Sequence, residues 1–459
     1  MSQPTLITEE YNFAISAKLS ELLAHSESES AAVIAEQARE VPAAELWERL
    51  QAASPQIRAN IFSYLEKDVQ VDIAEMLSRG ELAQLLSYMS PDDRVDLLKD
   101  LPEERAEAIL PALAQAQRED IRKLSSYPEG SAGAAMTSDY AVLTPELSAE
   151  QALVKLRREA PNKETIYYAY VIDSDRKLLG SVSLKDLILA RPHVKIEDIM
   201  QREIVFARAL EDQEEAARKI QKYDLIALPV INGGDALVGI ITHDDALDIV
   251  TQEHTEDLEK FMAIAGAHEA EMYRRTGAWT HFKNRVGWVM GLAVLGLVSG
   301  SIIHSFEATI ASLMILALYM PMIADSGGNT GSQAATVVVR ALALKEISTR
   351  DILHVLWKEL RVGLGLAVVL GVLSWGKVMF LSYGTELDLP VSLHTIGLVI
   401  ALALAIQVTT ATLIGAMLPM AASKLKLDPA VVASPALTTL VDISGLLIYF
   451  TTAKTLLGV

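Results

Sequence analysis

The chain has 459 residues and a formal net charge of −19, so it is strongly acidic and long enough for two or three domains. The acidity belongs to the first part alone, because residues 1–280 hold 50 Asp and Glu against 29 Lys and Arg, whereas residues 281–459 hold 9 against 11. This balance argues against a nucleic-acid partner, since phosphate binding needs clustered Lys and Arg. The absence of cysteine excludes disulfides, thiolate metal sites and cysteine nucleophiles.

The first 130 residues show a helical pattern. The opening stretch MSQPTLITEEYNF has neither a basic n-region nor an apolar h-region, so we expect no cleaved signal peptide and a cytoplasmic N-terminus. From about Leu19 to Leu124, segments such as AAELWERLQAA and DDRVDLLKDL repeat apolar residues at helical spacing. Turn signals separate these segments, as at Ser90-Pro91, where two aspartates in the first turn mark a helix start. Short helices about twenty residues apart predict a superhelical N domain over residues 1–130.

Residues 131–256 contain two copies of one α/β unit, over 136–193 and 200–256. Each copy opens with a Met-led segment, continues with an amphipathic helix, and ends in a pair of β-branched strands joined by a turn. Both copies share the motif G-x-x-[S/T]-x-x-D, formed by Gly180, Ser183 and Asp186 in the first and by Gly239, Thr242 and Asp245 in the second. The repeat resembles a tandem CBS pair, a family that dimerises and often binds adenine nucleotides.

Five apolar stretches follow, at about 286–306, 309–333, 361–382, 391–418 and 430–456. Each reaches or nearly reaches the ~20 residues that cross ~30 Å of hydrocarbon. We therefore predict an all-α membrane domain of five transmembrane helices per subunit over residues 283–459. A charged connecting helix is expected before it, over residues 257–282.

Charge placement orients this predicted bundle. Basic residues precede the first stretch and fill the loops after the second and the fourth, so they fall on one side of the membrane. The opposite loops carry His304 with Glu307, and Glu386 with Asp388. With the basic side and the N-terminus in the cytoplasm, five spans place the C-terminus outside.

The most informative apolar stretch is YMPMIADSGGNTGSQAATVVVR, residues 319–340. One proline and three glycines interrupt it, which predicts a break in the helix. Non-helical backbone at membrane depth is tolerated where it is buried in protein or lines water. Its freed carbonyls, together with the amide of Asn329, would be oxygen ligands for a hard cation, so Gly327, Gly328 and Asn329 form a candidate pore site. The alternative is a tight turn just outside the membrane.

Asp442 is a carboxylate in an otherwise apolar stretch, where Thr438 precedes it by one helical turn. A carboxylate inside a helix bundle usually marks an ion path or proton relay. The alternatives are a structural partner for a basic residue and an exposed helix N-terminus. Magnesium prefers octahedral oxygen and loses its water reluctantly, so a pore for it needs few direct ligands. Asp442, Asn329 and the glycine carbonyls supply such a set, and no His or Cys cluster offers a site for zinc or copper.

The motifs GGNTGSQAAT, GAMLP and SGLLIY, with YPEGSAGAAMT and HDDALDIVTQEHTEDL in the first part, resemble the MgtE family of magnesium channels. The resemblance runs from about residue 85 to the C-terminus. It implies a homodimer in a bacterial-type inner or plasma membrane, with one pore between the subunits, that imports Mg²⁺ and is closed by intracellular Mg²⁺. It also implies that Asp442 coordinates the hydrated ion and that Gly327, Gly328 and Asn329 line the same site. Asp325 departs from the family pattern, in which a neutral residue is common at this position.

The run HDDALDIVTQEHTEDLEKF at the end of the CBS pair places six acidic residues within fourteen positions. Like charges so close repel one another unless cations neutralise them, although a solvated acidic face is the alternative. The resemblance implies a Mg²⁺-sensing role for carboxylates here and upstream, at Asp92, Asp96, Glu214, Asp224, Asp245, Asp248, Glu253, Glu256 and Asp257. It also implies ATP binding at the CBS pair, where the matching positions are Tyr168, Lys185 and Asp186.

Two other functions stay open on the sequence. An ion-coupled secondary transporter of divalent cations such as Mg²⁺ and Co²⁺ would share the predicted broken helix and the intramembrane carboxylate. A membrane enzyme regulated by its CBS domains has less support, because the sequence shows no metal-binding His pair, no G-x-S-x-G and no P-loop. We therefore expect no enzymatic activity.

Overall fold

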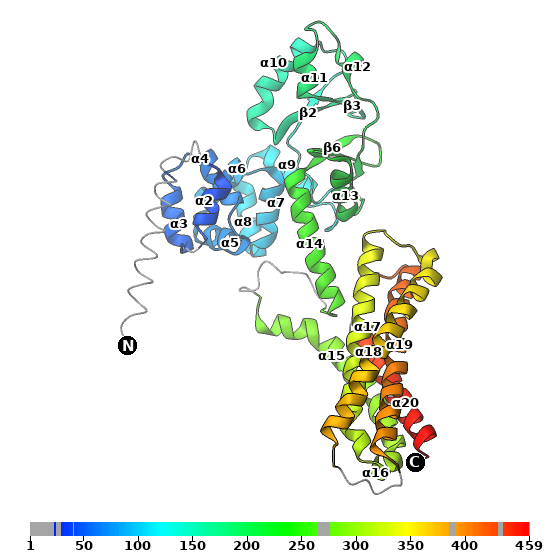
Figure 1. The fold of residues 1–459 in the computed structure, drawn as a ribbon. Coiled ribbons are helices and arrows are strands. Elements are labelled where there is room, and N and C mark those ends of the chain that lie inside the picture. Colours follow the sequence, from blue (N-terminus) through cyan, green and yellow to red (C-terminus); the bar gives the residue numbers. More distant parts are fainter. Residues whose placement is uncertain are drawn as a thin grey trace. The chain divides into compact units, whose positions relative to one another are not determined.

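The computed structural model describes residues 23, 29–39, 41–264, 276–384, 391–429 and 435–458. These residues form two compact units, of which one reaches Glu253 and the other starts at His254. The first unit holds short helices and two small sheets, and the second holds long helices (Figure 1). Part of the predicted connecting helix, residues 265–275, and the loop acids Glu386 and Asp388 lie outside the described residues.

The first unit begins with short helices of 7–10 residues. They are α2 (Ala31–Gln37), α3 (Ala43–Leu50), α4 (Pro55–Ser63), α5 (Lys67–Met76), α6 (Arg79–Tyr88), α7 (Pro91–Asp100), α8 (Glu103–Ile109), the 3₁₀ turn η1 (Leu110–Ala112) and α9 (Gln115–Leu124). From α2 to α7, each helix packs against the second helix after it along the chain. This is the packing of a helical superhelix, so the predicted N-domain fold is confirmed.

One side-chain role recurs in these helices. The fourth residue of α4, α5, α7 and α9 donates hydrogen bonds to carbonyls near the end of an earlier helix, and these residues are Arg58, Gln70, Arg94 and Arg118. Arg94 is buried, and it donates from Nε to the Leu86 carbonyl at 2.7 Å and from Nη2 to the Met89 carbonyl at 2.8 Å. The last carbonyls of a helix lack partners within that helix, so these side chains satisfy them.

Two three-stranded sheets follow, each with a parallel pair and an antiparallel pair of strands. The first repeat consists of β1 (Tyr140–Leu143), α10 (Ala149–Glu159), η2 (Ala160–Asn162), β2 (Thr165–Ile172), β3 (Leu178–Ser183) and α11 (Leu184–Leu189). After α12 (Ile196–Ile199), the second repeat consists of β4 (Ala207–Arg208), α13 (Gln213–Tyr223), β5 (Ala227–Ile231), β6 (Leu237–Thr242) and α14 (His243–Phe261). The predicted pair of α/β repeats is therefore confirmed.

The two repeats exchange their opening segments. Met136 of the first repeat packs against Gly239 of the second, and Met200 of the second packs against Gly180 of the first. A Cβ added to Gly180 would lie 2.7 Å from the Met200 Sδ, so each glycine makes room for the methionine of the other repeat. This reciprocal packing explains why both the Met-led segment and the motif glycine recur in the sequence.

The hydroxyl and carboxylate of the shared motif cap a helix. The Asp186 N–H donates to Ser183 Oγ at 3.1 Å, and the Ser183 hydroxyl donates to Asp186 Oδ2 at 2.6 Å. In the second repeat the Thr242 N–H donates to Asp245 Oδ2 at 3.3 Å, and the Thr242 hydroxyl donates to the same oxygen. Such contacts satisfy polar groups at a helix start, so both aspartates have a structural role.

The second unit is a bundle of long helices. They are α15 (Ala278–Ser305), α16 (Glu307–Ser312), α17 (Ile315–Ala343), η4 (Thr349–Asp351), α18 (Ile352–Leu381), α19 (Leu393–Lys424) and α20 (Pro435–Leu457). Within the described residues, α15, α18, α19 and α20 are long and apolar enough to cross a membrane. α17 has 29 residues and packs against α19 and α20, but polar residues and glycines interrupt its apolar pattern. By length and packing it is the fifth helix of the predicted bundle.

The predicted break in α17 is wrong, because the helix is continuous with Pro321 inside it. Pro321 lies in the second turn, so its missing N–H frees only one carbonyl near the helix start. A Cβ added to Gly331 would lie 3.2 Å from the Ala411 carbonyl oxygen, so this glycine permits close helix packing. The freed carbonyls predicted at Gly327 and Gly328 are absent from this part of the described chain, because both residues lie inside the continuous helix. The Ser326 and Gly327 carbonyls also accept from Thr330 Oγ1 at 2.9 and 3.1 Å.

Candidate cation sites

A cavity of about 430 Å³ lies between α17 and α20. Its lining residues are Pro321, Ala324, Asp325, Gly328, Asn329, Ser332, Thr438 and Asp442. The α17 members recur at intervals of three and one, which places them on one face of a continuous helix, and the two α20 members are one turn apart. The polar lining groups are two carboxylates, one amide and two hydroxyls. This oxygen-rich set suits a hard divalent cation that keeps part of its water shell.

Four of the five predicted pore residues line this cavity, and Gly327 does not. Gly327 is one position round the helix from Gly328 and faces Gln407 and Val441 instead. The sequence prediction missed Ser332 as a lining residue, and it noted Asp325 only as a departure from the family pattern. Both lie on the Asn329 face of α17, so helical spacing would have found them if no break had been predicted.

A cluster of carboxylates lies in the first unit, where the first turns of α7 and α14 lie near the residue that precedes β2. We call Asp92, Asp93, Glu164, Asp244 and Asp245 the acidic cluster. Desolvation raises the pKa of Glu164 to about 7, although the residue is exposed to solvent, and the charges of Asp245, Asp93 and Asp244 raise it too. Burial also raises the pKa of Asp245 to about 6, against the lowering effect of the bond from Thr242.

Asp92 is the carboxylate of the acidic cluster whose surroundings disfavour a negative charge most strongly. Burial raises its pKa well above the usual value, and the charges of Asp245 and Asp93 add to this effect. Its Oδ1 is buried and accepts no hydrogen bond within the described part of the chain. A buried carboxylate oxygen without a donor is unfavourable, and a cation would relieve it. Among the described residues, no group of three or more acidic or His side chains is close enough to coordinate a metal ion directly. The cluster therefore fits a cation that keeps its water shell better than a dehydrated one.

The structure separates the nine predicted sensor residues. Asp92 and Asp245 belong to the acidic cluster. Asp96 is exposed and pairs with Lys99 at 2.9 Å, and Asp224 ends α13 in a left-handed conformation with φ 49°. These last two residues have local structural roles outside the cluster.

Three further predicted sensor residues lie on α13 and α14. Glu214 pairs with Arg218 along α13, and Glu253 accepts from Gln213 Nε2 at 2.8 Å. Asp248 lies on the exposed side of α14. None of these three belongs to the acidic cluster.

The last two predicted sensor residues, Glu256 and Asp257, belong to the second unit. Lys260 pairs with Glu256 on the same helix and with Asp428 at 3.3 Å. Burial, followed by the charge of Asp428, raises the pKa of Asp257. The end of α14 therefore carries its own charged group, which includes both signs.

The sequence prediction counted Asp244 in the acidic run but left it out of the named set of sensor residues, and it did not include Asp93 and Glu164. The first two adjoin predicted residues, so their neighbours were a usable signal. Glu164 stands alone in the sequence, and only the fold brings it near Asp245 and Asp93.

The three predicted nucleotide positions lie close together on the first sheet. Tyr168 on β2 is in register with Ser183 on β3. Lys185 and Asp186 follow in the first turn of α11, and both are exposed. The Asp186 carboxylate already accepts a hydrogen bond from Ser183. Tyr168 and Lys185 are therefore the better candidates to contact a nucleotide.

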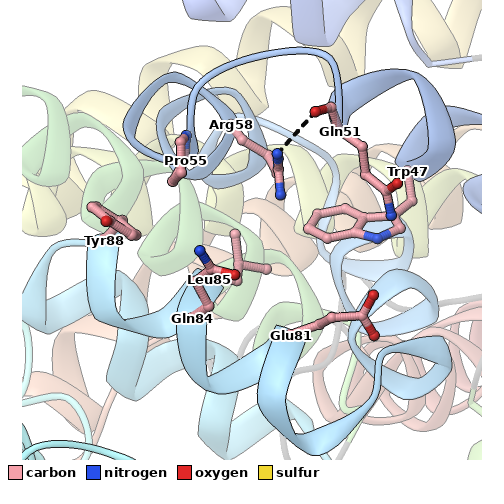
Figure 2. A pocket seen from close by; sticks show the side chains of 8 residues that line it. All are labelled: Trp47, Gln51, Pro55, Arg58, Glu81, Gln84, Leu85 and Tyr88. Carbon is pink, nitrogen blue, oxygen red and sulfur yellow. Dashed lines mark hydrogen bonds between the residues drawn. The ribbon is translucent and has the colours of Figure 1, made fainter.

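A second, much smaller pocket lies on the helical domain (Figure 2). Its volume is about 30 Å³, which suits a water molecule and no larger ligand. Arg58 lies over the Trp47 ring at 5.5 Å and donates to the carbonyls of Leu50 and Gln51 at 3.1 and 3.0 Å. The buried Trp47 Nε1 has no hydrogen-bond acceptor among the described residues, so a water would complete this structural contact.

The apolar helices, the oxygen-lined cavity between α17 and α20 and the acidic first unit together define a membrane protein that handles divalent cations. The chain belongs to the MgtE family, since residues 320–452 match the family described as divalent cation transporter. Residues 29–130 match the MgtE intracellular N domain, and residues 132–193 and 196–251 match the CBS domain.

Two curated relatives cover most of the chain. The magnesium transporter MgtE of Thermus thermophilus is 40% identical over 360 residues, which are 78% of this chain and 75% of the relative. The magnesium transporter MgtE of Bacillus subtilis is 35% identical over 386 residues, which are 84% and 83%. Among solved structures, the cytosolic domain of the Mg²⁺ channel MgtE in complex with ATP is 31% identical, with a TM-score of 0.48 over 52% of this chain and 99% of that one.

Proposed function

We propose that this chain imports Mg²⁺ through the cavity between α17 and α20, and that the acidic cluster closes this path when intracellular Mg²⁺ is high. The observation that carries the proposal is the cavity itself, which Asp442 of α20 lines together with Asp325 and Asn329 of α17. Carboxylates placed among apolar helices are costly unless they hold a cation. A hydrated Mg²⁺ would be held through its water by these oxygens, and the hydroxyls of Ser332 and Thr438 would add acceptors.

Replacing the carboxylate of Asp442 tests this pathway. Asp442→Asn keeps the side-chain shape and removes the charge, so we expect Mg²⁺ uptake by liposomes holding the purified protein to fall at least about tenfold. A fluorescent Mg²⁺ indicator inside the liposomes measures the rate. Glu307→Gln is the matched control, because Glu307 is an exposed carboxylate of the same unit outside the cavity. Uptake by Asp442→Asn at the parent rate would show that the ion takes another route.

The same liposomes separate a channel from an ion-coupled carrier. A channel passes Mg²⁺ down its own gradient and gives single-channel currents. A flux that requires a proton or sodium gradient would instead support the carrier.

The proposed closing mechanism uses α14 as a connector. Its first turn carries Asp244 and Asp245 of the acidic cluster, and its last residue, Phe261, packs in the second unit against an apolar cluster of α17, α19 and α20 that includes Val441. Mg²⁺ at the cluster would relieve repulsion between carboxylates and favour one position of this helix. Coupling of this kind needs different Mg²⁺ affinities in the open and closed states.

Glu164→Gln tests the closing mechanism without touching α14. The change removes one charge from the acidic cluster, so we expect a several-fold higher internal Mg²⁺ concentration to be needed for closure. Patch currents at stepped internal Mg²⁺ measure this. Glu150→Gln is the control, because Glu150 is an exposed acid in the first turn of α10. Closure of Glu164→Gln at the parent concentration would exclude Glu164 from the sensor.

We also propose that the chain works as a homodimer. The CBS region exposes large apolar side chains, including Tyr167 at 63%, Leu189 at 73% and Leu210 at 75%. It is favourable for a partner to cover large apolar side chains that are this exposed, because this removes them from water. Light scattering of the detergent-purified protein would give the mass of a dimer, and a monomer would reject this part of the proposal.

For the CBS pair we propose ATP as a ligand, held near Tyr168 and Lys185, with the ammonium group facing phosphate. Isothermal titration with ATP, compared with Lys185→Met, would measure this. The orientation proposed for the membrane unit places the N-terminus in the cytoplasm and the C-terminus outside, in an inner or plasma membrane, as the basic loops favour.

A further inference from the structure

A buried amide joins three helices next to the cavity. Gln407 on α19 is fully buried, and its Nε2 donates to the Val441 carbonyl of α20 at 2.8 Å. Val441 immediately precedes Asp442, so the bond holds the turn of α20 that carries the cavity carboxylate. Buried polar side chains that bond across helices fix the relative position of those helices.

Two glycines make room for this amide. A Cβ added to Gly327 of α17 would lie 2.5 Å from Gln407 Nε2, and a Cβ added to Gly445 of α20 would lie 2.7 Å from it. Gly327 adjoins the cavity residue Gly328, and Gly445 lies on the next turn after Val441. The amide is therefore wedged between the two helices whose opposite faces line the cavity.

The amide oxygen of Gln407 indicates that this side chain does more than fill space. Gln407 Oε1 is buried and accepts no hydrogen bond within the described part of the chain. An unsatisfied buried oxygen is destabilising, so a leucine or methionine of similar size would serve packing better. The amide therefore contributes what an apolar residue cannot, which is its hydrogen bond to the Val441 carbonyl beside Asp442.

We propose that Gln407 is a positioning residue that sets the placement of Asp442 relative to the cavity face of α17. The inference rests on the proposed function, because it assumes that the cavity holds Mg²⁺. Gln407 itself does not line the cavity and acts through the Val441 carbonyl. A displaced carboxylate would weaken the hold on the hydrated ion more than it would change the maximal rate.

The test compares the two side chains that donate to the Val441 carbonyl, Gln407 and Ser444. Ser444 Oγ also donates to the Val441 carbonyl, at 2.9 Å, but this bond stays within α20. We expect Gln407→Leu to raise the Mg²⁺ concentration for half-maximal liposome uptake about tenfold, with a small change in maximal rate. Ser444→Ala should leave both quantities near the parent values. An equal effect of the two variants would overturn the positioning role, because only one of the bonds joins two helices.

A second variant covers the case in which Gln407→Leu folds poorly. Gln407→Ala combined with Gly445→Ala removes the amide and places one methyl group in part of the space it leaves, which limits the loss of packing. We expect this double variant to unfold at a higher temperature than Gln407→Ala alone and to show the same weakened Mg²⁺ dependence. A parent-like dependence in the double variant would overturn the inference. If the parent protein itself takes up no Mg²⁺, the proposed function fails instead, so the two failures are distinct.

Discussion

Asp325 and Asp442 reach one cavity from two helices, so each carboxylate changes the electrostatic potential that the other experiences. A divalent cation between them is attracted by both, whereas without it the two negative charges repel each other. Asp325 lies one helical turn before Asn329 on the same face of α17. This geometry makes Asp325 a contributor to the capture of the ion even if Asp442 binds it more closely.

We expect Asp325→Asn to weaken Mg²⁺ capture while leaving passage possible. The concentration for half-maximal uptake should rise several-fold, and the effect should shrink at high ionic strength, because salt screens the attraction in an open cavity. Liposome uptake at stepped external Mg²⁺ measures both. Ser332→Ala on the same helix face is the control, since it removes a hydroxyl without changing charge. An unchanged Mg²⁺ dependence in Asp325→Asn would show that Asp442 acts alone.

The roles of single residues differ in how well the sequence predicts them. Asp442 could be predicted because a carboxylate within an apolar run has few structural explanations. Gln407 also interrupts an apolar run, but its role depends on glycines far along the chain that only the fold brings together. Glu164 lacks even a local signal, because its acidic neighbours come from α7 and α14.

At the scale of single elements, the N domain shows how short helices are joined. A helix of 7–10 residues has a large share of its carbonyls at its end, where no partner exists within the helix. Donors from the fourth residue of later helices satisfy these carbonyls, as Arg94 does for α6. The caps also fix the distance between successive helices, which helps the superhelix to form.

Arg94→Leu should destabilise the N domain. The substitution places an apolar side chain at the buried position but leaves the Leu86 and Met89 carbonyls without their donor, which costs about 1.5–3 kcal/mol for bonds from a charged group. We expect faster amide hydrogen exchange in α6 and α7 of the full chain. Arg122→Leu is the control, because Arg122 is exposed on α9. Equal protection in Arg94→Leu and the parent would mean that water replaces the guanidinium without loss.

The elements themselves were predictable where periodicity was strong. The short amphipathic helices and the repeated strand pairs follow from local spacing of apolar residues, which the structure confirms. The break predicted in α17 failed because Pro321 and the glycines were interpreted by their local propensity. In the bundle Gly331 instead contacts the Ala411 backbone, and helix packing outweighs the propensity of the isolated segment.

At the scale of the whole molecule, the two units have opposite chemistry. The acidic first part holds carboxylates whose pKa values rise because they are desolvated close to one another. The second unit is nearly neutral, and its two cavity carboxylates lie on α17 and α20. One helix, α14, contains residues of both units. An ion bound at the start of this helix would therefore act on a segment that continues into the membrane unit.

This arrangement predicts a pH dependence of stability that Mg²⁺ removes. The folded-state pKa values of Glu164, about 7, and Asp245, about 6, lie above their ordinary values. The protonated forms therefore stabilise the folded first unit, and this contribution is fully present below about pH 4 and is lost as the pH rises through 6 and 7. With a chelator present, we expect amide hydrogen exchange in α7 and α14 of the full chain to become faster between pH 5 and 8 than the intrinsic exchange rate explains.

Mg²⁺ at millimolar concentration should restore the protection at pH 8 and change little at pH 5, because protons already neutralise the cluster there. Glu164→Gln should flatten the pH dependence in the chelator, since the carboxyl whose pKa is raised to about 7 no longer titrates. Ca²⁺ is the competing ion, and a cluster that binds Mg²⁺ through retained water should respond to it differently. Protection that is independent of pH and of Mg²⁺ would contradict the proposal that these carboxylates share a cation.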